Sequence, residues 1–144
     1  MVAVVVYHIN PAWLPGGFVG VDVFFVISGF LITAGILNRI ETTGQFSLMQ
    51  FWANRARRIL PAATVTIVVV SVLSLWFLPL TRLKDVATQG IASALYIQNF
   101  ALARQSVDYM AADAKPTPFQ HFWSLSLEEQ FYVVWPLLVV VAGL

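Results

Sequence analysis

Residues 61–80 read PAATVTIVVVSVLSLWFLPL, a run of 20 residues without Asp, Glu, Lys or Arg. A helix rises about 1.5 Å per residue, so about 20 residues cross a hydrocarbon core of roughly 30 Å. Residues 17–37 form a similar run of 21 residues with Asp22 as its one charge, and residues 86–103 a run of 18 with none. The sequence therefore predicts helices that cross a lipid bilayer.

Charge is concentrated between these runs. Apolar residues make up 59% of the chain and charged residues 10%, against about 45–50% and about 25% in typical soluble proteins. Apart from Asp22, every charged residue lies in one of three windows, 39–58, 82–85 and 104–129. This pattern predicts an all-α fold, a polytopic transmembrane helical bundle of about five spans. The first span (1–9) and the last (130–144) are expected to be incomplete.

The basic residues predict an orientation. Loops 38–60 and 104–127 hold six Lys and Arg residues, and loops 10–16 and 81–85 hold two, which places the first pair in the cytoplasm. Topology thus explains the basic residues, and we expect contact with lipid and not with nucleic acid. The chain has no cysteine, which excludes thiol catalysis, disulfides and Cys-ligated metal here. We expect no metal site.

A short amphipathic helix is predicted in the first cytoplasmic loop. Ser47 and Gln50 fit a capping box, which favours a helix over residues 48–60 that ends where Pro61 opens the next span. At about 100° per residue, one face of this helix carries an apolar stripe formed by Leu48, Phe51, Trp52 and Ile59.

Three arginines occupy different faces of this predicted helix. Arg55 falls in the middle of the apolar stripe, Arg58 on its flank and Arg57 on the opposite side. A guanidinium that faces inward is unfavourable unless it meets an anion, and arginine binds phosphate or carboxylate bidentately. We therefore predict that Arg55 and Arg58 bind a phosphorylated ligand, whereas Arg57 reaches lipid headgroups. Alternatively, all three only set the topology.

Two adjacent carboxylates open the last apolar run. Ser126 and Glu129 fit a second capping box, which gives Glu129 a structural role and leaves Glu128 unexplained. Glu128 shares a helical face with Tyr132, where it could orient an arginine or carry a proton. The alternative is a simple salt bridge to an arginine. Both interpretations predict that Glu128 lies near the arginines.

Two ionisable residues lie in the first two apolar segments. His8 precedes Asn10-Pro11, and a neutral imidazole at membrane depth suits general-base chemistry; alternatively it touches headgroups. Asp22 follows GGFVG at 16–20, whose small residues let backbones approach closely. Asp22 could orient the ring of His8 or cap the second helix.

Four sequence blocks, in this order, resemble acyltransferase family 3, the membrane O-acetylases of bacterial polysaccharides and peptidoglycan. They are VVVYH at 4–8, GGFVGVDVFFVISGFLIT at 16–33, FWANRARRILPA at 51–62 and HFWSLSLEEQFYVVWP at 121–136. The resemblance covers nearly the whole chain. It implies that residues 1–144 are part of the transmembrane domain of this family, its N-terminal half, truncated at both ends.

The resemblance implies that an acetyl or acyl group moves from cytoplasmic acyl-CoA to a hydroxyl of a cell-envelope glycan or lipid-linked sugar. Acetyl-CoA would be the donor substrate, with no tightly bound cofactor, in a multi-pass protein of the bacterial inner (plasma) membrane. His8 corresponds to the family's membrane histidine, Arg55 and Arg58 to its Arg-x-x-Arg motif for the coenzyme A phosphates, and Glu128 to its motif glutamate. We expect His8 to act as the general base.

Two other classes of function fit the residues taken alone. One is a proton-coupled transporter, in which His8 and Asp22 relay protons and the arginines bind an anion; it predicts helices broken near the membrane midplane. The other is a non-catalytic membrane anchor, for which buried ionisable residues would be unfavourable. The wording of the four blocks favours the enzyme.

Overall fold

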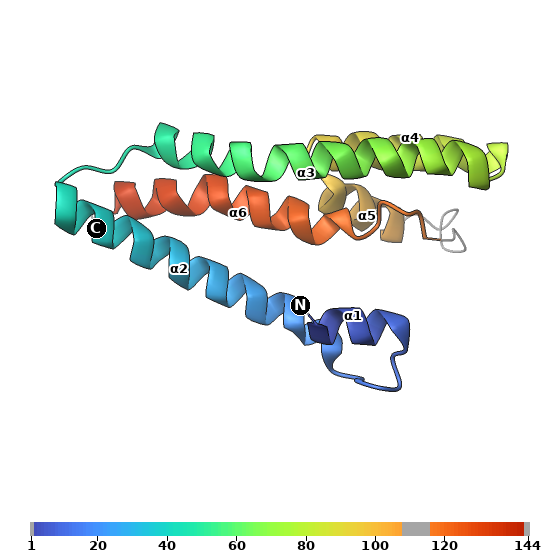
Figure 1. Ribbon diagram of the computed structural model, residues 1–144, viewed down its shortest axis with the longest axis horizontal. Helices are drawn as coiled ribbons and strands as arrows, with labels where there is room; N and C mark the ends of the chain where they lie inside the picture. The colour runs from blue at the N-terminus through green and yellow to red at the C-terminus, as the bar shows by residue number, and fades with distance from the viewer. Residues whose placement is uncertain (1, 108–115, 143–144) are drawn as a thin grey trace. The chain divides into compact units, whose positions relative to one another are not determined.

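The structure is a computed structural model that describes residues 2–107 and 116–142, without the side chain of His8. The elements in this part are all helical (Figure 1), which confirms the predicted all-α class. In chain order they are α1 (Val2–Ile9), the short 3-10 helix η1 (Gly17–Val19), α2 (Gly20–Thr43), α3 (Leu48–Phe77), α4 (Leu80–Ala94), α5 (Gln98–Val107) and α6 (Phe122–Val141).

Three stretches of the described chain are long and apolar enough to cross a membrane, namely η1 with α2, α3 and α6. Their outer surfaces carry large apolar side chains. At the end of α3, for example, Trp76 is 81% exposed and Phe77 78%. Exposed apolar surface on this scale is rare in soluble monomers and marks contact with lipid or another protein. The sequence predicted spans at each of these three places.

The cytoplasmic helix predicted over residues 48–60 is not separate from the span that follows. Helix α3 begins at Leu48, as predicted, but continues for 30 residues to Phe77 with Pro61 inside it. Proline removes one backbone hydrogen bond without ending the helix, which membrane helices tolerate. The predicted loop 38–60 is correspondingly short, because α2 runs to Thr43 and is ended by Gly44 at φ 69°.

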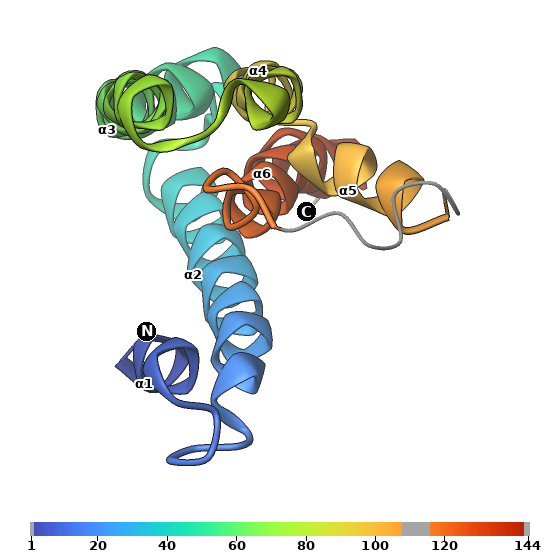
Figure 2. The ribbon, with the colours of Figure 1, turned by 90° about the vertical axis from the view of Figure 1, so that its right-hand side faces the viewer.

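The span predicted over residues 86–103 is wrong, because the chain breaks there. Helix α4 already begins at Leu80, includes the predicted loop 81–85 and ends at Ala94, and α5 begins at Gln98 in a different direction (Figures 1 and 2). Tyr96, between the two helices, has a φ of 55°, which is uncommon for a residue with a Cβ. An uncharged run of the right length therefore did not give a continuous helix.

Side chains of α6 hold the break between α4 and α5. The side-chain amide of Gln130 donates to the carbonyl of Tyr96 (2.7 Å) and to Oδ1 of Asn99 (3.0 Å). The backbone N–H of Gln98, at the start of α5, donates to the hydroxyl of Ser126 (3.3 Å). These bonds satisfy backbone groups that a break would otherwise leave unpaired.

The last span also begins earlier than predicted. The sequence placed a cytoplasmic loop over residues 104–127, but α5 extends to Val107 and α6 begins at Phe122. Residues 108–115 of that loop, with Lys115, lie outside the described residues. With 20 residues, α6 is long enough to span, so residues 130–141 continue a helix that begins at Phe122.

The chain divides into two compact units, Met1–Leu48 with Val134–Leu144, and Met49–Val133. In the first unit, glycines bring α1 close to η1 and α2. A Cβ on Gly17 would lie 2.4 Å from the carbonyl oxygen of Ala3 and 2.7 Å from Cβ of Tyr7, and a Cβ on Gly20 would lie 2.9 Å from Cγ2 of Val4. This confirms the close backbone approach predicted for GGFVG.

The second unit contains a buried cluster of amide and hydroxyl groups. The Gln98 amide donates to Oε1 of Gln89 (2.9 Å), and the Gln89 amide donates to Oε1 of Gln105 (3.0 Å). The hydroxyl of Thr117 also donates to Oε1 of Gln89. Buried polar groups are stable only when hydrogen-bonded, so this cluster joins α4, α5 and the segment before α6.

Candidate functional site

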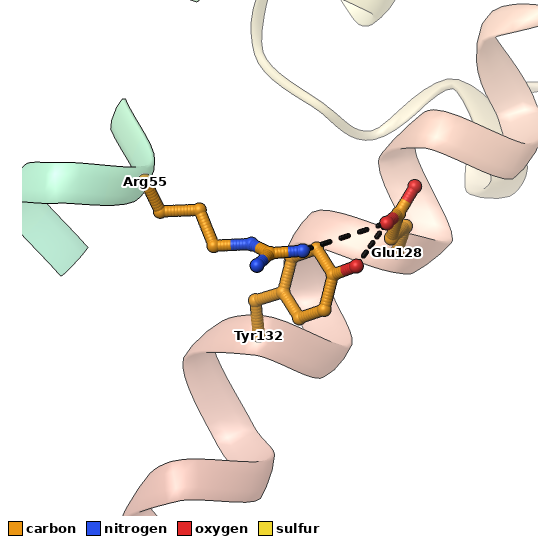
Figure 3. Close-up of polar contacts among 3 residues, drawn as sticks. All are labelled: Arg55, Glu128 and Tyr132. Atoms are coloured by element: carbon orange, nitrogen blue, oxygen red, sulfur yellow. Dashed lines mark hydrogen bonds and ion pairs between the residues drawn. The ribbon is translucent and has the colours of Figure 1, made fainter. Parts of the chain in front are cut away.

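A cationic side chain of α3 reaches two residues of α6 (Figure 3). The guanidinium carbon of Arg55 lies 3.1 Å from the centre of the Tyr132 ring, and Nη2 of Arg55 lies 3.6 Å from Oε1 of Glu128. The hydroxyl of Tyr132 donates to the same oxygen of Glu128. The predicted proximity of Glu128 to an arginine is therefore confirmed for Arg55.

The helical spacing of α6 produces this arrangement. Glu128 and Tyr132 are four residues apart, so their side chains lie on the same face one turn apart. Tyr132 is 2% exposed, and the side chains of Arg55 and Glu128 are 25% and 14% exposed. Removing one partner of such a partly buried ion pair costs more than the about 1 kcal/mol of an exposed pair and less than the about 3–5 kcal/mol of a fully buried one, because the other charge is left uncompensated. The pair therefore fixes the guanidinium in place.

A third contact ties the same turn of α6 to α3. Pro136 has no N–H, so it cannot bond the carbonyl of Tyr132, four residues earlier. The indole Nε1–H of Trp52 donates to that carbonyl instead, at 3.1 Å. The proline thus frees a backbone acceptor, and the tryptophan of α3 uses it.

We expect a double-mutant cycle to show that Trp52 and Pro136 are coupled through the carbonyl of Tyr132. Trp52→Phe leaves the carbonyl of Tyr132 unpaired and should lower the free energy of unfolding by about 1–3 kcal/mol. Pro136→Ala restores a backbone N–H that can pair with this carbonyl. In a protein that already carries Pro136→Ala, Trp52→Phe should therefore lower the free energy of unfolding by about 1 kcal/mol less than it does in wild type. Thermal unfolding in nanodiscs of full-length wild type, the two single variants and the double variant measures this coupling. Additive effects would contradict it.

A cavity of about 170 Å³ lies beside Arg55. Its walls combine aromatic, aliphatic and polar side chains from α3, α6 and the α4–α5 break: Trp52, Arg55, Ala56, Ile59, Leu60, Tyr96, Glu129, Tyr132 and Val133. An apolar cavity with a few polar groups is the usual form of a small-molecule site. The Arg55 contacts therefore position a cation at the wall of a cavity that could take a ligand.

The prediction of a capping box formed by Ser126 and Glu129 is wrong. Helix α6 begins at Phe122, so Ser126 and Glu129 lie beyond its first turn and do not cap it. Ser126 is fully buried and accepts the bond from Gln98, and Glu129 lines the cavity. Burial raises the pKa of Tyr96, also in the cavity wall, and the Glu129 carboxylate raises it further. The Tyr96 hydroxyl therefore stays protonated and able to donate.

The three arginines of α3 differ in exposure. Arg55 is partly buried, and Arg57 and Arg58 are exposed. The prediction that Arg55 faces inward is confirmed, whereas Arg58 does not join it in the contact with Glu128 and Tyr132. An exposed arginine one turn beyond Arg55 can still meet a phosphate group that approaches from the aqueous side. The role of Arg58 in binding phosphate stays a prediction.

His8 and Asp22 lie in the first unit. The backbone of His8 belongs to α1, and its side chain lies outside the described part of the structure, as does any pairing with Asp22. Asp22 is exposed in the first turn of α2, where a negative charge interacts favourably with the helix dipole. The N-cap position is Val19, so the expectation that Asp22 caps this helix was wrong.

Sequence reasoning missed two polar members of the cavity. Tyr96 was placed inside a continuous span, and Glu129 was assigned to a helix cap. The spacing of Tyr132 and Pro136 could have indicated a free carbonyl at Tyr132, because a proline inside a helix frees the carbonyl four residues earlier; the donor, Trp52, could not be predicted in this way. Among the described residues, no group of three or more His, Cys, Asp or Glu could hold a metal ion.

Comparison with known proteins gives a consistent result. An acyltransferase domain family matches residues 1–142. The chain is 43% identical over 141 residues to the peptidoglycan O-acetyltransferase OatA of Listeria monocytogenes, covering 98% of this chain and 22% of that protein. It is 40% identical over 139 residues to the O-acetyltransferase OatA of Staphylococcus aureus, covering 96% and 23%. The chain thus spans less than a quarter of the length of these relatives. No solved structure matches it.

Proposed function

This chain belongs to acyltransferase family 3, and from that premise we propose that it works in a membrane O-acyltransferase. The donor is acetyl-CoA, which the enzyme takes from the cytoplasm, and the acceptor is a hydroxyl of a cell-envelope glycan or lipid-linked sugar. Similarity to a protein named peptidoglycan O-acetyltransferase supports this acceptor class. Three stretches able to cross a membrane support a multi-pass protein of the bacterial plasma membrane.

The observation that carries the proposal is the fixed position of Arg55. Its guanidinium is stacked on Tyr132 and paired with Glu128 at the wall of a cavity. An arginine fixed in this way can bind an anion without first losing side-chain freedom. Arg58 is exposed one turn further along α3 and supplies a second cation. Together they suit the phosphates of coenzyme A, and Glu128 positions the first of them.

In the proposed reaction the acceptor hydroxyl oxygen attacks the carbonyl carbon of the acetyl thioester. A new C–O bond forms, the C–S bond breaks and coenzyme A leaves as a thiolate. His8 takes the proton of the attacking hydroxyl as general base, and this proton can neutralise the departing thiolate. The negative charge of Asp22 lies in the same unit, at the start of α2.

One observation bears on the transporter alternative. The break between α4 and α5 is the kind of interrupted helix that a transporter would use. The side chains that hold this break are neutral, namely Asn99, Ser126 and Gln130. Neutral amides and hydroxyls do not titrate near pH 7, so the side chains that hold the break cannot relay protons, and we retain the enzyme.

The proposal is tested with full-length protein in inverted membrane vesicles supplied with radiolabelled acetyl-CoA and cell-wall glycan acceptors. We expect label to become covalently attached to the glycan as an ester that mild alkali releases. Empty-vector vesicles are the control. Uptake of a small solute without covalent transfer from the thioester would favour the transporter.

A further inference from the structure

Three buried polar atoms of the cavity wall have no hydrogen-bond partner among the described residues. They are Nε of Arg55, the hydroxyl oxygen of Tyr96 and Oε1 of Glu129. More than about 90% of buried polar groups in proteins are paired. Three unpaired atoms, contributed by α3, the α4–α5 break and α6 to the wall of one cavity, point to a ligand that pairs with them.

The chemistry of these atoms defines the ligand. Arg55 Nε–H and the Tyr96 hydroxyl are donors, and the Glu129 carboxylate is an acceptor. The matching group has a carbonyl oxygen that accepts two bonds and an N–H that donates one, which describes a secondary amide. The rest of the wall is aromatic or aliphatic, including Trp52, Ile59 and Val133. Such a wall suits methylene groups on either side of the amide.

We propose that this cavity binds a secondary amide of the pantetheine arm of the acyl donor. Arg55 and Tyr96 donate to the amide oxygen, and Glu129 accepts from the amide N–H. Acyl-CoA carries two such amides, separated by methylene groups, between its phosphates and its thioester. This inference rests on the proposed function and extends it, because it assigns Tyr96 and Glu129 to donor binding.

An N-acetyl group on a sugar acceptor has the same amide chemistry. The structure favours the donor for two reasons. Arg55 both lines the cavity and belongs to the proposed phosphate site, so one extended molecule can reach both. A cavity of about 170 Å³ accommodates part of an unbranched chain more readily than a sugar ring carrying several hydroxyls, which would need further polar partners.

The test combines a protein change with a donor change. Full-length wild type, Glu129→Gln and Glu129→Met are assayed with acetyl-CoA and with an analogue in which esters replace the pantetheine amides. Glu129→Gln keeps an acceptor oxygen but loses the carboxyl group, and should raise KM for acetyl-CoA about tenfold. Glu129→Met has no acceptor and should raise it about fiftyfold. Tyr96→Phe should raise it about fivefold. The exposed Arg57→Ala is the control.

The analogue separates the possible outcomes. For wild type, KM should be about fiftyfold higher for the ester analogue than for acetyl-CoA. For Glu129→Met, KM should differ little between the two donors, because the acceptor for the amide N–H is already gone. If replacing acetyl-CoA by the analogue raised KM equally in wild type and in Glu129→Met, the proposal would be overturned. If the Glu129 substitutions raised KM for the glycan and left KM for acetyl-CoA unchanged, the cavity would bind the acceptor, and the proposal would also be overturned. Failure of wild type to use acetyl-CoA at all would instead refute the proposed function.

Discussion

Arg55→Ala should lower kcat/KM for acetyl transfer by about a thousandfold in the full-length protein, while Arg57→Ala should stay within about twofold of wild type. Two losses combine in Arg55→Ala. The donor phosphates lose a fixed cation, and the Glu128 carboxylate, 14% exposed, loses its counter-charge. The second loss also frees the carboxylate that fixes the geometry of the site. A thousandfold loss of kcat/KM corresponds to about 4 kcal/mol, because 1.4 kcal/mol corresponds to tenfold. Initial rates with radiolabelled acetyl-CoA in membrane vesicles measure the effect.

Arg55→Lys guards against a simple folding defect. Lysine keeps the charge but lacks the planar group that stacks on Tyr132 at 3.1 Å. It should leave the protein folded and lower kcat/KM about tenfold to thirtyfold. Equal losses in Arg55→Ala and Arg57→Ala, at equal amounts of folded protein, would show that exposure of the arginine is irrelevant and would contradict the site.

Gly17→Ala should lower acetyl transfer about a hundredfold, although Gly17 lies far along the chain from the arginines. An added Cβ would lie 2.4 Å from a backbone oxygen of α1, so α1 itself must move. Helix α1 carries His8, the proposed general base. A shift of about 1 Å in a catalytic group can reduce the rate about a hundredfold. The loss should fall on kcat, with KM for acetyl-CoA little changed.

Gly16→Ala is the matched control for this change. Gly16 is the neighbouring residue, its φ is −90°, and a Cβ there would meet nothing within 4 Å. We expect nearly wild-type rates and the same melting temperature. If Gly16→Ala and Gly17→Ala reduced transfer equally, the close approach of α1 would not be the cause.

Much of the site was predictable from local rules. Placing residues 48–60 on a helix separated an inward Arg55 from an outward Arg57, because residues two apart on a helix face different ways. The unfavourable energy of an unpaired inward charge then predicted a carboxylate nearby. Glu128 was the available candidate, and it is the partner that the structure shows. The glycines of GGFVG similarly predicted a close backbone contact.

The errors arose where distant residues decide local structure. The run 86–103 has the length of a span, but Gln130 and Ser126 of α6 pair with its backbone and stabilise a break at Tyr96. Ser126 and Glu129 match a capping box, yet the helix had already begun at Phe122. Neither the pairing of α6 with the break nor the start of α6 at Phe122 could be predicted from neighbouring residues. The cavity depends on both, which is why its polar members were missed.

The central claim is that Arg55, fixed by Glu128 and Tyr132, binds the donor. The most direct test is calorimetric titration of coenzyme A into full-length protein in nanodiscs, for wild type, Arg55→Ala and Arg57→Ala. We predict a Kd at least about thirtyfold higher for Arg55→Ala than for wild type, and a Kd for Arg57→Ala within about twofold. The same Kd for wild type and Arg55→Ala, in protein that remains folded, would contradict the account.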